Sequence, residues 1–141
     1  MAITRTETDV TWSATASITV SSNTQADSDS MTVDATCVAL GLIIHADNQG
    51  TPASGDYVDF YLKPGVGSVD GSAGDDWATD EHALYLGRID TFASNTPGED
   101  PARLYVELPI GMKNFKLSHK ANQAATRNVL LRARMHEVRA A

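Results

Sequence analysis

Apolar side chains recur at every second position along most of this chain, and polar side chains fill the positions between them. Residues 9–20 alternate in this way, with Ser or Thr between the apolar positions Val10, Trp12, Ala14, Ala16, Ile18 and Val20. Successive side chains of a β-strand point to opposite faces, so this spacing predicts strands with one buried and one wet face. We therefore expect an all-β fold.

Seven or eight such runs are separated by turn-rich segments, a rhythm typical of an antiparallel β-sandwich of jelly-roll or Ig-like type. The expected strands are residues 9–20, 31–35, 37–46, 57–63, 84–90, 103–108, 114–120 and 128–138. Residues 37–46 carry apolar side chains on both faces, which predicts a central strand. Residues 21–30 are polar, have nothing to bury, and are expected to form a loop.

The length of 141 residues suits one domain whose two-layer core needs neither disulfides nor a metal. We expect this domain over residues 9–141, after a flexible N-terminal arm at residues 1–8. The arm is polar, basic at Arg5, and either lies across a neighbouring subunit or is disordered. The single cysteine, Cys37, has apolar neighbours and is predicted to be a buried core thiol.

Residues 64–80 are rich in Gly and Asp and predict a long loop, with a helical turn allowed within residues 75–83. Loops of this length are uncommon in compact domains unless they bind something. Trp77 lies in this loop and either caps the core or anchors an interface.

The chain has a net charge of −7, and its charged residues are distributed unevenly along the sequence. Residues 1–100 hold 3 basic and 16 acidic side chains, whereas residues 101–141 hold 8 and 2. Strands that mix in space would neutralise this charge internally; alternatively, a basic edge of one copy meets acidic loops of another copy or of a scaffold. The second interpretation gives these interface candidates: Arg5, Asp75, Asp76, Trp77, Arg127, Arg132, Arg134 and Arg139.

No local signature of an enzyme is present, so we expect no catalytic residues and no cofactor. The four histidines, His45, His82, His119 and His136, lie in separate predicted elements and form no metal-binding motif. Acidic residues within 70–81 are of the type that calcium prefers, but they lack EF-hand spacing, so a solvated loop without metal is expected.

Nucleic acid and membranes are not expected partners. Phe115 lies between the basic residues Lys113 and Lys116, and its alternation places it inward rather than against bases. The negative net charge also repels phosphate. No secretory leader or membrane-spanning apolar stretch is recognisable.

Three segments resemble small virion proteins of tailed bacteriophages that are encoded among head and tail morphogenesis genes and described as structural or as head decoration (cement) proteins. They are TASITVSSN (15–23), ADNQGTPASGDYVDFYLK (46–63) and NFKLSHKAN…RNVLLRARMHEVRA (114–140). The resemblance implies a β-sandwich that binds the major capsid protein and copies of itself, commonly as a trimer. It also implies a place on the capsid surface of a virion assembled in the host bacterial cytoplasm.

We therefore expect a non-enzymatic capsid decoration subunit. The alternative is a phage tail component or a receptor- or carbohydrate-binding β-sandwich module. That role needs exposed aromatic rings, for which Tyr57, Tyr61, Trp77 and Tyr85 are available. A host-encoded secreted carbohydrate-binding module or enzyme is the remaining possibility, and nothing in the sequence directs secretion.

Overall fold

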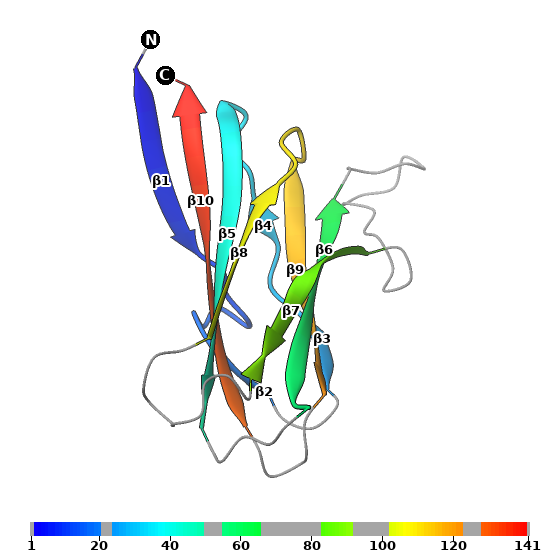
Figure 1. The fold of residues 1–141 in the computed structure, drawn as a ribbon. Helices are drawn as coiled ribbons and strands as arrows, with labels where there is room; N and C mark the ends of the chain where they lie inside the picture. Colours follow the sequence, from blue (N-terminus) through cyan, green and yellow to red (C-terminus); the bar gives the residue numbers. More distant parts are fainter. Residues whose placement is uncertain are drawn as a thin grey trace.

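The computed structural model describes residues 2–20, 24–49, 55–65, 83–91, 102–122 and 128–140, which form two antiparallel sheets packed face to face (Figure 1). The first sheet contains β1 (Ile3–Asp9), β2 (Ile18–Val20), β5 (Cys37–Asn48), β8 (Ala102–Leu108) and β10 (Val129–Ala140). The second contains β3 (Gln25–Asp27), β4 (Met31–Thr32), β6 (Tyr57–Gly65), β7 (Leu84–Asp90) and β9 (Asn114–Asn122). The predicted all-β sandwich is confirmed.

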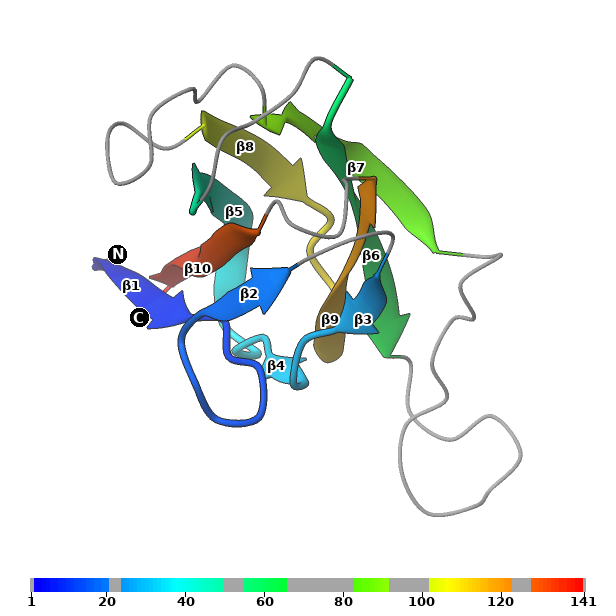
Figure 2. The same cartoon turned by 90° about the horizontal axis from the view of Figure 1, so that it is seen from below.

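The strand order is that of a jelly roll. The first sheet runs β1-β10-β5-β8, with β2 following β1 along the same edge of β10. The second runs β3-β9-β6-β7, with β4 on the same edge of β9 as β3. β1 and β2 share one position in the first sheet, and β3 and β4 share one position in the second. If each of these two pairs is counted as a single strand, the chain has eight strands, and in chain-order numbering the sheets run 1-8-3-6 and 2-7-4-5. Figure 2 shows the two layers from below, with β7 and β8 adjacent at one side.

The core lies between the sheets and is built by the alternating apolar positions. Each of the four longest strands turns every second side chain inward, where it is buried. These are Leu40, Leu42, Ile44 and Ala46 on β5; Val58, Phe60 and Leu62 on β6; Phe115, Leu117 and Ala121 on β9; and Val129, Leu131, Ala133 and Met135 on β10. Removal of this apolar area from water is the main term that stabilises the sandwich.

The sequence locates the later strands well. The six expected from residue 37 onward, β5 to β10, are all present, and their ends lie within two residues of the expected ones. β5 pairs with both β10 and β8, which confirms the predicted central strand. β4 lies within the strand expected at residues 31–35. Cys37 is half-buried rather than fully buried, and burial raises the pKa of its thiol.

The continuous strand expected at residues 9–20 is wrong. The chain turns at Ser13 and Ala14, whose φ angles are 48° and 65°, and Trp12 and Thr15 bridge across the turn. The Asp29 carboxylate accepts hydrogen bonds from the Ala14 N–H at 2.9 Å and the Thr11 hydroxyl at 2.7 Å. These bonds lower the pKa of Asp29. Within residues 9–20, Asp9 ends β1, and the remaining part that joins the sheet as a strand is β2.

The N-terminal segment also differs from expectation. Ile3–Asp9 does not form a flexible arm, because all seven residues pair with β10 as β1. Part of the expected polar loop at residues 21–30 is strand β3. The loop expected at 64–80 lies, from residue 66 onward, outside the described residues, as does the helical turn within 75–83 except for Ala83.

Candidate interaction face on the first sheet

The outward side of the first sheet, here called the outer face, gathers residues from four strands in register. Side chains alternate along each strand, so residues that neighbour each other across strands share a face. From β10 the outer face receives Arg132, Arg134 and His136; from β5, Gly41, Ile43 and His45; from β8, Arg103, Tyr105 and Glu107; and from β1, Arg5, Glu7 and Asp9.

One row of this face is basic. Arg132 is the register partner of His45, which in turn is the partner of Arg103, and we call these three residues the cationic row. Both arginines are exposed, and neither forms an ion pair with a described residue. The pKa of His45 is lowered, first by partial burial and then by Arg103 and Arg132, so its ring stays neutral at neutral pH. Two guanidinium groups beside a neutral imidazole suit carboxylate or phosphate oxygens.

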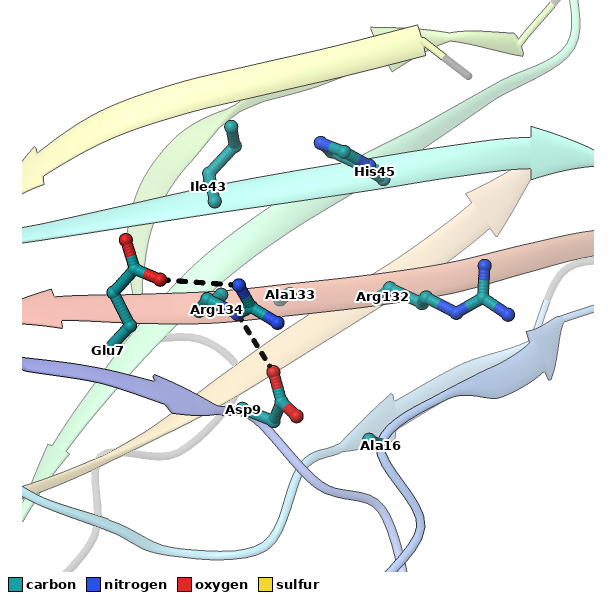
Figure 3. A pocket seen from close by; sticks show the side chains of 8 residues that line it. All are labelled: Glu7, Asp9, Ala16, Ile43, His45, Arg132, Ala133 and Arg134. Atoms are coloured by element: carbon teal, nitrogen blue, oxygen red, sulfur yellow. Dashed lines mark hydrogen bonds and ion pairs between the residues drawn. The ribbon is translucent and has the colours of Figure 1, made fainter. Parts of the chain in front are cut away.

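The next row is neutralised within the chain. Arg134 donates to Asp9 at 3.0 Å and to Glu7 at 3.3 Å, and these bonds raise its pKa (Figure 3). Glu7 also lies 3.8 Å from His136. Figure 3 shows the Arg132 side chain extending away from these ion pairs. Arg132 and Arg134 line an open hollow of about 550 Å³. Internal neutralisation thus holds for Arg134, whereas Arg132 forms no ion pair with an acidic residue of the described ranges.

The other end of the face carries several exposed apolar side chains. Tyr105 is 61% exposed, and its ring lies across Gly41, where an added Cβ would be 2.7 Å from the Tyr105 hydroxyl oxygen. Val38 and Ile110 are also exposed there and line a second hollow of about 580 Å³ together with Tyr105. An exposed aromatic ring beside arginines is the composition found at protein interfaces.

Arg139 is engaged on the inner side of β10. Its guanidinium donates to the fully buried carboxylate of Glu137 at 2.7 Å and lies 3.7 Å from Asp34. The Asp34 backbone N–H donates to the other oxygen of Glu137 at 2.9 Å. Because a buried carboxylate needs a charged or hydrogen-bonding partner, Arg139 has a structural role within the chain.

Of the predicted interface residues, Arg5, Arg132 and Arg134 share the outer face, whereas Arg139 does not. Asp75, Asp76, Trp77 and Arg127 lie outside the described residues. Sequence reasoning did not select His45, Arg103 and Tyr105 for this surface. The alternation in their strands places them outward, but only the register shows that they lie beside Arg132 and Arg134.

The outer side of the second sheet carries an aromatic cluster. Tyr61 and Tyr85 meet edge to face with ring centroids 5.4 Å apart, and Tyr85 is 57% exposed. The Arg88 guanidinium lies 3.5 Å from the centre of the Tyr57 ring and covers that face of it. Asp59 accepts two hydrogen bonds from Arg88, at 2.8 and 3.0 Å, and one from the Tyr85 hydroxyl at 3.1 Å. Tyr85 is therefore the ring of this cluster most open to a ligand.

Within the described ranges, no three His, Cys, Asp or Glu side chains are placed to share a metal ion. The acidic residues within 70–81 that were considered as calcium ligands lie outside these ranges. No helix in the described part of the chain is long and apolar enough to cross a membrane.

Comparison with known proteins supports the fold. No protein-family model matches the chain, and no curated protein matches its sequence. Among solved structures, the chain is similar to VP2 of the infectious bursal disease virus subviral particle, with a TM-score of 0.50, 8% identity and 96% of this chain covered. The match spans 32% of the VP2 chain. A family 16 carbohydrate binding module-2 aligns over 88% of this chain and 79% of its own, with a TM-score of 0.37 and 11% identity.

Proposed function

We propose that this chain is a non-enzymatic virion structural protein, a head decoration subunit of a tailed bacteriophage that binds the major capsid protein and copies of itself on the capsid surface. The observation that carries the proposal is the cationic row of Arg132, His45 and Arg103 beside the exposed Tyr105 on one open sheet face. The sequence resemblance to phage virion proteins supports the same role, and the VP2 match supports only the fold.

The outer face supplies two kinds of contact for such docking. The guanidinium groups of Arg132 and Arg103 bind carboxylates of an acidic capsid segment, and their long-range attraction increases the rate of encounter. Tyr105 then buries apolar area against the capsid, which adds affinity that salt does not screen. Binding that exists only on the assembled shell stabilises that shell against rupture.

Co-sedimentation with heads of the encoding phage that lack this protein tests the proposal. We expect the purified chain to bind these heads, and Arg132→Glu to weaken binding at least about tenfold because it places a carboxylate against an acidic partner. Lys120→Glu is the matched control: it makes the same charge change at an exposed position on β9, in the other sheet, and should bind normally.

Circular dichroism and thermal unfolding test whether both variants are folded. Affinity of the unaltered chain should also fall as salt rises from about 0.05 to 0.5 M. Failure of the unaltered chain to bind the heads would refute the decoration role. Equal binding by Arg132→Glu and Lys120→Glu would remove the outer face from the contact.

The second candidate function is carbohydrate binding by a tail- or receptor-facing module, and the exposed ring of Tyr85 beside Asp59 and Arg88 favours it. Aromatic rings stack on sugars while charged side chains bind their hydroxyl groups. A glycan array with the purified chain, repeated with Tyr85→Ala, tests this function. Binding that Tyr85→Ala abolishes supports it, and an array without a hit contradicts it.

A further inference from the structure

The free edge of β1 is the feature of the first sheet that neither proposed function uses. β1 pairs with β10 along one side and is the outermost strand of its sheet in both views (Figures 1 and 2). No described strand pairs with its other side. Six of the seven residues of β1 are exposed, so the described part of the chain leaves this strand open to solvent. Such an edge presents backbone N–H and C=O groups that can pair with another strand.

The register identifies which backbone groups are free. The Val10 N–H donates to the Ala133 C=O at 2.9 Å, directly after the Asp9–Arg134 register pair. In an antiparallel ladder the N–H and C=O of one residue point the same way, and successive residues point to opposite sides. Even-numbered residues of β1 therefore bond to β10. The N–H and C=O groups of Ile3, Arg5, Glu7 and Asp9 point to the free edge.

We propose that β1 pairs with β1 of a second copy, antiparallel and centred on Thr6, which joins the first sheets of two copies into one continuous sheet. In this register Arg5 lies opposite the second copy's Glu7, and Ile3 lies opposite its Asp9. All four free-edge residues then exchange both backbone hydrogen bonds with a partner residue, as the hydrogen-bonded positions of an antiparallel pair do.

Charge selects this register among the possible ones. A shift that centres the pair on Arg5 places two arginines opposite each other, which is destabilising. One centred on Glu7 places two glutamates opposite each other, which offsets part of the attraction in its two Arg5–Asp9 pairs. The Thr6 register instead forms two Arg5–Glu7 pairs related by the two-fold axis. Arg5 forms no ion pair with a described residue of its own chain and is available for this contact. It would extend the existing network of Glu7, Arg134 and Asp9.

Edge strands often carry charges that prevent such pairing. On β1 the charges have opposite signs at symmetric positions, so a two-fold arrangement matches them instead of opposing them. The contact is isologous and closes with two copies. The axis stands perpendicular to the sheet, so both outer faces, each with its cationic row, point to the same side of the pair.

Sedimentation equilibrium of the full chain tests the inference without any capsid. We expect a concentration-dependent species of twice the 15.1 kDa chain mass. Arg5→Glu places a glutamate opposite Glu7 of the other copy in both pairs. Glu7→Arg places an arginine opposite Arg5 of the other copy in both pairs. Each should weaken dimerisation roughly tenfold or more. An equimolar mixture of the two variants should restore it, because each pair in the mixed dimer again joins opposite charges.

A backbone variant separates pairing from charge. Arg5→Pro removes one free-edge N–H and no bond to β10, so it should abolish the dimer, whereas Arg5→Gln should weaken it only moderately. Circular dichroism verifies the fold of each variant; Arg5→Glu, Arg5→Pro and Arg5→Gln leave the Glu7–Arg134 ion pair in place. A monomeric unaltered chain, an assembly whose mass neither charge variant changes, or a mixture that fails to restore the dimer overturns the inference.

Discussion

The buried His119 predicts a loss of stability in mild acid. His119 is 1% exposed, lies between Phe60 on β6 and Ala26 on β3, and its Nδ1 has no hydrogen-bond partner among the described residues. Burial lowers its pKa to about 4, against a smaller opposing effect of Asp27. The folded state therefore holds a neutral ring at a pH where the unfolded chain, with an ordinary histidine pKa near 6.5, binds a proton.

The sign and size follow from these two values. Because the folded pKa is the lower one, the full stability is present above about pH 6.5 and falls as the pH drops toward 4. Between about pH 7.5 and pH 5 the free energy of unfolding should decrease by about 2 kcal/mol through this residue. His45 acts in the same direction, since its pKa is lowered as well.

Urea unfolding at a series of pH values between about 5 and 7.5 measures this loss. His119→Leu should remove most of the slope, whatever its effect on absolute stability, whereas His136→Gln, at a half-exposed position on the outer face, should keep it. The reasoning is refuted if His119→Leu retains the slope of the unaltered chain. An NMR titration of His119 with a midpoint near 6.5 would contradict it equally.

Backbone geometry gives three further predictions. Gly87→Ala should lower the free energy of unfolding by about 1–3 kcal/mol, because φ is +152° there and a Cβ would lie 3.1 Å from the Leu104 side chain; urea unfolding with unchanged stability would contradict this. Gly41→Ala should cost less than about 1 kcal/mol, since the exposed Tyr105 ring can swing away, and the tyrosine NMR signals should shift. Ala14→Gly should stabilise the chain by about 1 kcal/mol because its φ of 65° disfavours a side chain. A lower melting temperature for Ala14→Gly would show that this turn is unstrained.

The sequence predicts strands well where large apolar side chains alternate. Leu40, Leu42 and Ile44 on β5, or Val58 and Phe60 on β6, each remove enough area from water to determine which face turns inward. A slip by one residue would expose all of them. Strand position and side-chain direction are therefore readable from these segments without any tertiary information.

The N-terminal segments lack this energetic signal. Ala14 and Ala16 bury little area, so their alternation does not hold the chain extended, and the hydrogen bonds to Asp29 stabilise a turn there instead. β1 is a strand that the sequence pattern does not reveal. Both of its faces are exposed to solvent, so apolar and polar side chains do not alternate along it. Its place depends on the ladder with β10, a contact between the two ends of the sequence.

The candidate interaction face was predictable in part. The alternation of β10 correctly turns Arg132 and Arg134 outward, but the neutralisation of Arg134 by Glu7 and Asp9 depends on the unexpected strand β1. Arg139 follows the same period to the inner side of the strand, where Glu137 is buried. The register of the strands determines which arginine lacks an acidic partner among the described residues. The composition of the chain does not determine this.

The position of β10 has a consequence for how the chain acquires its shape during synthesis. This strand comes last among those of the described chain, yet it occupies the middle of the first sheet and supplies the ladder to β1, β2 and β5. Until residues 129–140 leave the ribosome, the N-terminal strands of that sheet have no neighbour to pair with. Assembly of this sheet must therefore wait until β10 has been synthesised, and in that interval chaperones can hold the exposed apolar segments of the earlier strands.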